Sequence, residues 1–138
     1  MRPTCCEPIP SLGFSVRGSR RRESRRPESP PKDRSVLGRF RAGELVMRLG
    51  ARPEELFFWA THGGAELDLL VVRGNRRLGF EIKRTTAPST SRSVHAARMT
   101  LGLEHIDVVH AGDHTYELAA GVRALAFSRL FDDVQPLA

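Results

Sequence analysis

The chain has 138 residues, an apolar content of 40% and a formal net charge of +6. No apolar run approaches the ~18 residues that a membrane-spanning helix needs, so these values exclude an integral membrane protein and fit one small domain with a tail. The only cysteines, Cys5 and Cys6, are adjacent, and the N-terminus lacks the apolar stretch of a signal peptide, so we expect a reducing cytoplasm rather than a disulfide-bonded secreted protein.

The first segment, residues 1–35, is rich in proline, serine and arginine. Residues 1–41 hold 11 Lys and Arg against 4 Asp and Glu, whereas residues 42–138 hold 11 against 12. Because such a segment buries too little apolar surface to offset the entropy of ordering it, we predict a disordered arm at 1–35 and a folded domain at 36–138. A basic arm can attract nucleic acid non-specifically, but a solvated leader without a selected role is the stronger interpretation.

Two elements are predicted at the start of the folded domain. Residues 36–49 carry a helical pattern of apolar side chains, which Gly50 and Pro53 end. The apolar and aromatic run 56–60 is typical of a buried strand, and the turn at 62–64 leads into the next strand.

A β-hairpin follows, because the two-residue turn Gly74-Asn75 lies between two apolar-rich runs. In an antiparallel pair closed by this turn, opposing residue numbers add up to 149, so Asp68 faces Glu81 and Glu66 faces Lys83. Side chains alternate across a strand, so these four polar groups share one face. The other face is predicted to be apolar and to consist of Leu67, Leu69, Val71, Leu78, Phe80 and Ile82.

The acids of this hairpin predict a metal site. Carboxylates directly opposite each other, with Cβ atoms roughly 5 Å apart, repel unless a positive charge lies between them. Mg²⁺ usually takes one or two carboxylates with waters and substrate phosphates, so we expect Asp68 and Glu81 to bind Mg²⁺ or Mn²⁺. Lys83 would orient a water or stabilise charge in the transition state, with Glu66 flanking the site. Without a metal, the alternative is a solvent-facing hairpin in which Glu66 pairs with Lys83.

A helix and two more strands complete the predicted domain. A polar loop after Lys83 precedes a helix over 93–101, which Ser91 or Ser93 caps and Gly102 ends. A helical crossover of this kind leads to a strand in the same sheet rather than to another hairpin. The predicted strands are 106–110 and 122–127.

The hairpin motif also carries a family resemblance. Asp68, a twelve-residue gap and Glu81-Ile82-Lys83 resemble the PD-(D/E)XK nuclease signature. More closely, the run from Leu56 to about Leu130 resembles a nuclease-like domain of unknown function found at the C-terminus of many bacterial and archaeal P-loop (AAA-type) ATPases. The segments that carry the resemblance are Phe57–Trp59, Gly64–Leu69, Gly79–Lys83 and Val108-Val109 with Gly112.

The resemblance implies a restriction-endonuclease-like α/β core of a helix, a three-strand antiparallel meander, a crossover helix and a further strand. It implies a metal site on the second and third strands and an additional acid from the first helix, for which Glu44 is the only candidate. It also implies an ATPase partner, since the missing G-x-x-x-x-G-K-S/T motif means that this chain is not itself the ATPase.

We therefore expect a nuclease-like domain that hydrolyses a phosphodiester, in DNA, with the help of Mg²⁺. Arg77 and Arg84, near the same hairpin, are candidate phosphate contacts, although solvated surface is the stronger interpretation of each alone. The alternative function is a non-catalytic interaction or regulatory module derived from an AAA-type ATPase.

Two other candidate sites carry less weight. His110 and His114 are four residues apart, but the intervening Ala-Gly-Asp predicts a turn, so surface histidines are favoured over a zinc site. The aromatic run Phe57–Trp59 could stack on a nucleic-acid base, but a run of consecutive aromatics before a turn favours core packing.

Overall fold

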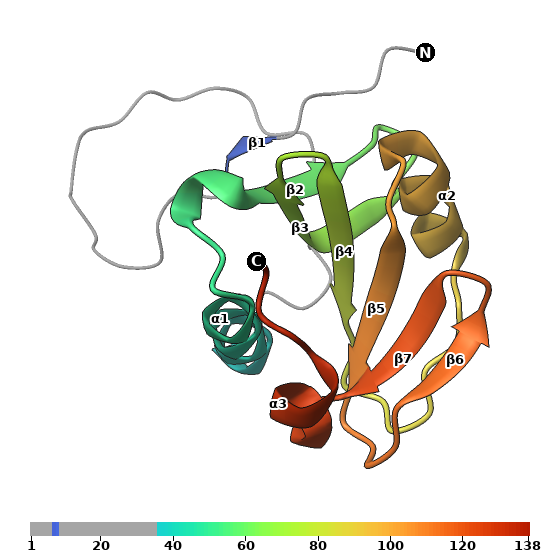
Figure 1. The fold of residues 1–138 in the computed structure, drawn as a ribbon. Coiled ribbons are helices and arrows are strands. Elements are labelled where there is room, and N and C mark those ends of the chain that lie inside the picture. Colours follow the sequence, from blue (N-terminus) through green and yellow to red (C-terminus); the bar gives the residue numbers. More distant parts are fainter. Residues whose placement is uncertain (1–6, 9–35) are drawn as a thin grey trace, which may run out of the picture.

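One mixed β-sheet organises the chain in the computed structural model, which describes residues 7–8 and 36–138 (Figure 1). The strand order is β1-β2-β3-β4-β5-β7-β6. The strands are β1 (Glu7–Pro8), β2 (Leu56–Ala60), β3 (Glu66–Arg73), β4 (Arg76–Ile82), β5 (His105–His110), β6 (Tyr116–Ala119) and β7 (Val122–Ala126). The helices are α1 (Val36–Leu49), α2 (Arg92–Leu101) and the short α3 (Leu130–Asp133), with 3-10 turns at Pro53–Glu55 and Phe127–Arg129.

The sheet changes character at its centre. β2, β3 and β4 form an antiparallel meander, and α2 then crosses over so that β5 runs parallel to β4. β7 runs parallel to β5 on its other side, and β6 pairs antiparallel with β7 at the edge. This arrangement confirms the predicted α/β class.

Helices cover both faces of the sheet, as Figure 1 shows. On one face, α1 and α3 bury Leu45, Leu49 and Leu130 against β4 residues such as Phe80. On the other face, α2 buries Val94 among side chains of β3 and β5. The sheet therefore divides the core into two layers. Each aliphatic or aromatic side chain buried in these layers contributes roughly 1.5–3 kcal/mol of hydrophobic stabilisation.

Local capping fixes the ends of α2. The Ser91 Oγ accepts a hydrogen bond from the Val94 N–H at 3.3 Å, and Gly102 ends the helix in the left-handed conformation with a φ of 60°. Arg77 of the hairpin adds a second cap, because its Nη1 donates to the Leu101 carbonyl at 2.8 Å. The hairpin and the crossover helix are thereby joined.

Two arginines fasten the C-terminal segment to the domain. Arg73 binds Glu55 through two nitrogens at 2.6 and 2.7 Å and also donates to the Leu137 carbonyl at 2.7 Å. Arg48 of α1 donates to the carbonyls of Val134 and Phe131, both at 2.7 Å. Such bidentate and multiple donation is what the planar guanidinium provides, so α1, β3 and the chain end form one unit.

The predicted elements compare closely with the structure. The helix 36–49, the strand 56–60 and the Gly74-Asn75 turn are confirmed, and the later helix and strands agree within one residue at each end. Of the two predicted caps, Ser91 is the one used. Strand β6 was not predicted. The disorder predicted for residues 1–35 lies outside the described residues, except that Glu7 and Pro8 form β1 against β2.

In the part of the chain that the structure describes, no helix is long and apolar enough to cross a membrane.

Candidate functional site

A β-bulge in β3 places Asp68. Between the pairs Phe57 with Leu70 and Trp59 with Leu67, one residue of β2 lies opposite two residues of β3. The extra residue shifts the alternation of side chains along β3. The prediction that Leu67 shares a face with Leu69 is therefore wrong: Leu67 packs in the α2 layer with Trp59, whereas Leu69 packs in the α1 layer.

The carboxylate of Asp68 takes the place of a main-chain partner for β4. The β3–β4 ladder follows the predicted sum of 149 from Leu69 with Phe80 to the turn, and it ends before Asp68. Beyond that point, the Asp68 Oδ2 accepts a hydrogen bond from the Ile82 N–H at 2.7 Å. The side chain of Asp68 is thus fixed between the two strands, and the regular pairing that would set Glu66 against Lys83 does not extend that far.

The surroundings of Asp68 disfavour its ionised form. Burial raises the pKa of Asp68, the charge of Glu81 raises it further, and the hydrogen bond from Ile82 only partly opposes them, so that the pKa rises from 3.8 to about 7. Glu66 and Lys83 also act on this group electrostatically. The four polar residues predicted for the site are therefore within electrostatic range of one another.

Glu81 is the most enclosed acid of the group, with 2% of its surface exposed. The Lys83 Nζ lies 3.3 Å from the Glu81 Oε1. The main chain of Lys83 is held on two sides, since its N–H donates to the Val109 carbonyl at 2.8 Å and its carbonyl accepts from the Arg41 Nη1 at 3.0 Å. Arg41 belongs to α1 and is itself buried, so the helix and β5 together set the position of Lys83.

The other predicted site residues lie in different settings. Glu66 is partly buried at the start of β3, where it pairs with Ala60 of β2. Glu44 is partly buried on α1, but the α1 residue that contacts the end of β4 is Arg41. Arg77 caps α2, as described above, and Arg84 is exposed. Among residues 7–8 and 36–138, no group of three or more His, Cys, Asp or Glu side chains is arranged to hold a metal ion.

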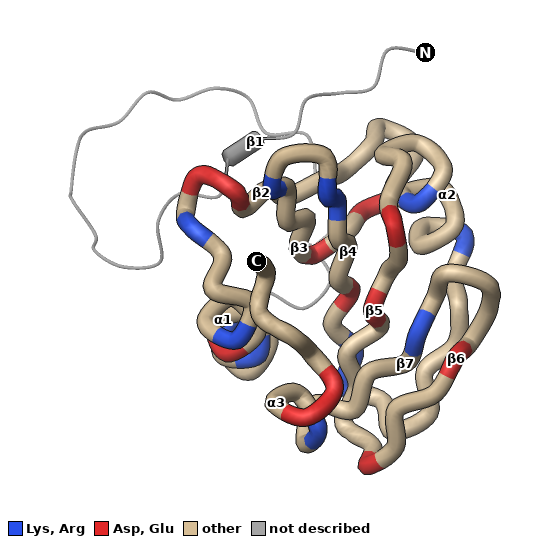
Figure 2. The backbone as a smooth tube through the Cα atoms, in the orientation of Figure 1, with Lys and Arg blue, Asp and Glu red and all other residues tan. Residues whose placement is uncertain are grey.

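The donor set nevertheless fits a magnesium-like ion with few protein ligands. Asp68 and Glu81 offer carboxylate oxygens, which hard cations prefer, and Mg²⁺ is commonly bound by one or two carboxylates with several waters. The raised pKa of Asp68 points the same way, because a cation between the two groups would offset the repulsion that Glu81 exerts. The Lys83 ammonium lies beside Glu81. Figure 2 shows acidic positions on β3, β4 and β5, next to one another in the sheet.

The histidine pair is not a zinc site. His110 is 1% exposed, so the expectation of a surface histidine is wrong for this residue. The Gly112 N–H donates to its Nδ1 at 3.1 Å, which leaves Nε2 to donate to the His114 carbonyl at 3.0 Å. Both ring nitrogens are used to hold the turn. For the aromatic run, the favoured interpretation of core packing is confirmed at Trp59, which is 1% exposed and packs in the α2 layer.

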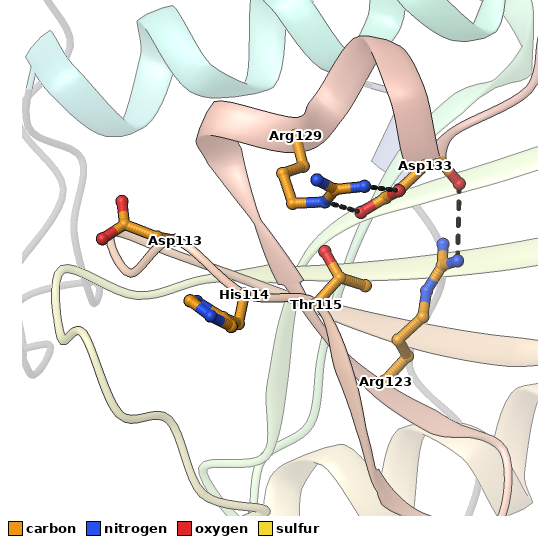
Figure 3. Close-up of a pocket in the computed structure, with 6 residues that line it drawn as sticks. All are labelled: Asp113, His114, Thr115, Arg123, Arg129 and Asp133. Carbon is orange, nitrogen blue, oxygen red and sulfur yellow. Dashed lines mark hydrogen bonds and ion pairs between the residues drawn. The ribbon is translucent and has the colours of Figure 1, made fainter.

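A second polar cluster was not anticipated from the sequence. Asp107 of β5 is 1% exposed and accepts two hydrogen bonds of 2.8 Å from Arg123 of β7. Arg123 also reaches the Asp133 carbonyl at 3.4 Å, and Arg129 pairs with the Asp133 carboxylate (Figure 3). Arg123, Arg129 and Asp133 border an open depression of about 500 Å³ that Asp113, His114 and Thr115 complete.

Both arginines of this depression are paired with acids of the protein. Burial alone would raise the pKa of Asp107, but hydrogen bonds from His105 and Arg123 lower it overall. The pKa of Asp133 is likewise lowered, chiefly by Arg129. Because each arginine already has an acidic partner, the cluster serves to join β5, β7 and α3. The sequence signal that could have predicted a buried, paired Asp107 is its position between apolar residues of a strand, Ile106 and Val108.

Comparison with known proteins identifies relatives of this chain. A family model described as Domain of unknown function (DUF4143) matches residues 38–130. Two uncharacterized proteins, one from Mycobacterium bovis and one from Mycobacterium tuberculosis, are each 41% identical to the chain over 91 residues, which cover 64% of this chain and 21% of the relative. The chain therefore spans about a fifth of the length of these curated relatives. No solved structure matches it.

Proposed function

Because the chain belongs to the family described as Domain of unknown function (DUF4143), whose description names no activity, we propose its function from the candidate site. The proposed reaction is hydrolysis of a phosphodiester, in DNA, with Mg²⁺ or Mn²⁺ bound at Asp68 and Glu81. One observation carries the proposal: Asp68 is partly buried and the charge of the buried Glu81 on the adjacent strand disfavours its ionisation, with Lys83 3.3 Å from Glu81. Perturbed acids of this kind are frequent at catalytic sites.

The electrostatics favour a cation as the missing component. The fold's packing does not require two acids here, since a hydrophobic or amide side chain would avoid the repulsion between Asp68 and Glu81. The Lys83 ammonium lies 3.3 Å from one oxygen of Glu81, and its effect on Asp68 is the smallest of the causes that set the pKa of that group. A divalent ion would neutralise both carboxylates at once.

The roles of the residues follow from their positions. Bound Mg²⁺ would act as a Lewis acid and lower the pKa of a coordinated water. Asp68 would hold the ion with a side chain whose orientation is fixed by the Ile82 N–H. Lys83, with its main chain held by Val109 and Arg41, would place its ammonium against a phosphate oxygen on which negative charge develops.

We further propose that the core is a member of the PD-(D/E)XK nuclease-like group. The order of α1, the β2-β3-β4 meander, α2 and the parallel strand β5 supports this proposal. Asp68 and Glu81-Ile82-Lys83 lie on the second and third strands of that meander. Arg41 of α1, rather than the acid Glu44, contacts the end of β4, which is a departure from the pattern that the resemblance implies.

The test is a plasmid nicking assay on the purified chain with Mg²⁺ or Mn²⁺, using supercoiled and single-stranded DNA. Asp68→Asn and Lys83→Met should each reduce the rate by at least about 100-fold, in the range of a positioned catalytic group. Asp132→Asn is the matched control, since Asp132 is an exposed acid of α3. Nicking at the same rate by the wild type and both site variants would refute the assignment.

A specific observation supports the alternative of a non-catalytic interaction module. The chain spans about a fifth of its curated relatives, and α1 exposes Val36, Phe40 and Met47 at 86%, 57% and 76%. A partner such as an ATPase domain would cover apolar side chains of this kind. In that case the assay above detects no metal-dependent nicking, whereas Phe40→Ser and Met47→Ser would weaken a complex in size-exclusion chromatography.

A further inference from the structure

The crossover between β4 and β5 has an unusual charge. Residues 82–103, which we name the basic crossover, hold four Lys and Arg and no Asp or Glu. The rest of residues 42–138 holds seven Lys and Arg against twelve Asp and Glu. The segment therefore has a net charge of +4 (4 − 0) and the rest of residues 42–138 a net charge of −5 (7 − 12), and Figure 2 shows basic positions on α2 without an acidic one.

We propose that the basic crossover is the surface that binds the phosphate backbone of a nucleic acid and leads it to the candidate site. This inference rests on the proposed function for its choice of partner. Most protein–DNA hydrogen bonds go to phosphate and sugar, from Arg and Lys and from the hydroxyls of Ser and Thr. Seven Ser and Thr residues accompany the four cations in this segment, so the segment has both kinds of donor.

The outer face of α2 is open to a ligand. Val94 and Ala97 face the sheet and are fully buried. Arg92, His95 and Met99 are exposed and lie at the i, i+3 and i+7 positions, which places them together on the outward face of the helix. In the loop before the helix, Arg84 is exposed as well. A nucleic-acid backbone would meet Arg92 on this outward face.

Arg98 of α2 and Arg77 of β4 lie against other parts of the protein and are not counted as contacts. The guanidinium of Arg98 lies against Gly121, where an added Cβ would come within 2.5–2.7 Å of it. Arg77 donates to the C-terminal carbonyl of α2. The number of phosphates held by the crossover is therefore small, on the order of one per exposed cation.

The basic crossover and the side chain of Glu81 lie on the same face of the sheet. A Cβ on Gly79 would point into the α2 layer, 2.7 Å from Leu103 and 3.1 Å from Ile106. Glu81 is two residues further along β4, so its side chain leaves the sheet on that face too. Lys83, the first cation of the crossover, is 3.3 Å from Glu81. A strand held along α2 thus reaches Lys83 and Glu81 without passing around the sheet.

The test measures binding without cleavage. The full chain in EDTA is titrated against a fluorescein-labelled 20-base-pair DNA duplex, and the dissociation constant is taken from anisotropy at 50 to 200 mM NaCl. Each phosphate contact adds about 0.9 to the slope of log K against log salt, so Arg92→Glu should lower that slope by about one and weaken binding several-fold. An acid suits the first turn of a helix, so this variant keeps α2 folded.

A matched variant and a second polyanion make the outcome decisive. Arg39→Glu changes the charge equally on α1, where Arg39 is exposed, and it should leave binding unchanged. Equal weakening by Arg39→Glu and Arg92→Glu would overturn the proposal, and so would displacement of the duplex by polyglutamate at the same charge concentration. Binding that depends on Arg92 in a chain that never nicks DNA would refute the proposed function and leave this surface standing.

Discussion

Replacing Asp68 with asparagine should remove a pH dependence from the stability of the protein. Burial and the charge of Glu81 raise the pKa of Asp68 from 3.8 to about 7. Because the folded state binds this proton more tightly than the unfolded chain, the stabilisation is fully present below pH 3.8 and is lost as the pH rises to about 7. Asparagine keeps an oxygen that accepts from the Ile82 N–H but cannot ionise.

The size of the effect follows from the shift. A change of roughly three pKa units corresponds to about 4 kcal/mol at 1.36 kcal/mol per unit. Asp68 is only partly buried, so solvent screening reduces the expected difference to about 2–4 kcal/mol. The wild type should therefore lose that much stability between pH 4 and pH 8, and Asp68→Asn should exceed it in stability at pH 8.

Urea unfolding measures this directly, because the chain has one tryptophan, Trp59, which is 1% exposed and reports on loss of the core. Curves would be recorded in EDTA at unit pH steps from 4 to 8. Asp132→Asn is the control for removing an exposed acid. If the stabilities of the wild type and Asp68→Asn change in parallel over this range, the argument that Asp68 is protonated near neutral pH is wrong.

Two further predictions concern the packing that supports the site. Arg123→Met leaves the buried carboxylate of Asp107 without its two 2.8 Å hydrogen bonds from Arg123. The free energy of unfolding, measured by urea denaturation, should fall by about 3–5 kcal/mol. A loss below about 1 kcal/mol would contradict the importance of this buried pair. Gly79→Ala places a Cβ 2.7 Å from Leu103 and should cost about 1–3 kcal/mol. In contrast, Gly43→Ala on α1 meets nothing within 4 Å and should stabilise the protein by about 0.5–1 kcal/mol; similar effects at both glycines would argue against close packing of α2 on β4.

Local sequence signals were sufficient where the structure depends on near neighbours. The Gly74-Asn75 turn fixes the β3–β4 register because strand pairing in a hairpin is set by its loop. Ser91 and Gly102 bound α2 because caps act within one turn of the helix. Because the turn sets the register over a few residues, the sequence also predicts that Asp68 and Glu81 lie close together.

Three features of the fold depend on contacts between residues far apart in the sequence and could not be predicted from local sequence patterns. The bulge of β3 arises from its pairing with β2, so the hairpin alone gave no sign that Leu67 would turn to the α2 layer. The burial of His110 depends on a turn that closes over it through Gly112. Edge strand β6 has little apolar patterning of its own and forms only against β7.

The sequence by itself determined α1, α2, the hairpin and the pair Asp68 and Glu81, since side-chain periodicity and turn chemistry act over a few residues. Only the tertiary structure decided the state of that pair. The pKa of Asp68 depends on how the sheet and helices exclude water and on the nearby charge of Glu81, and the position of Lys83 depends on Arg41 of a distant helix. Burial and long-range contacts are properties of the packed chain, and they decide the ionisation of Asp68, which the sequence pattern alone does not contain.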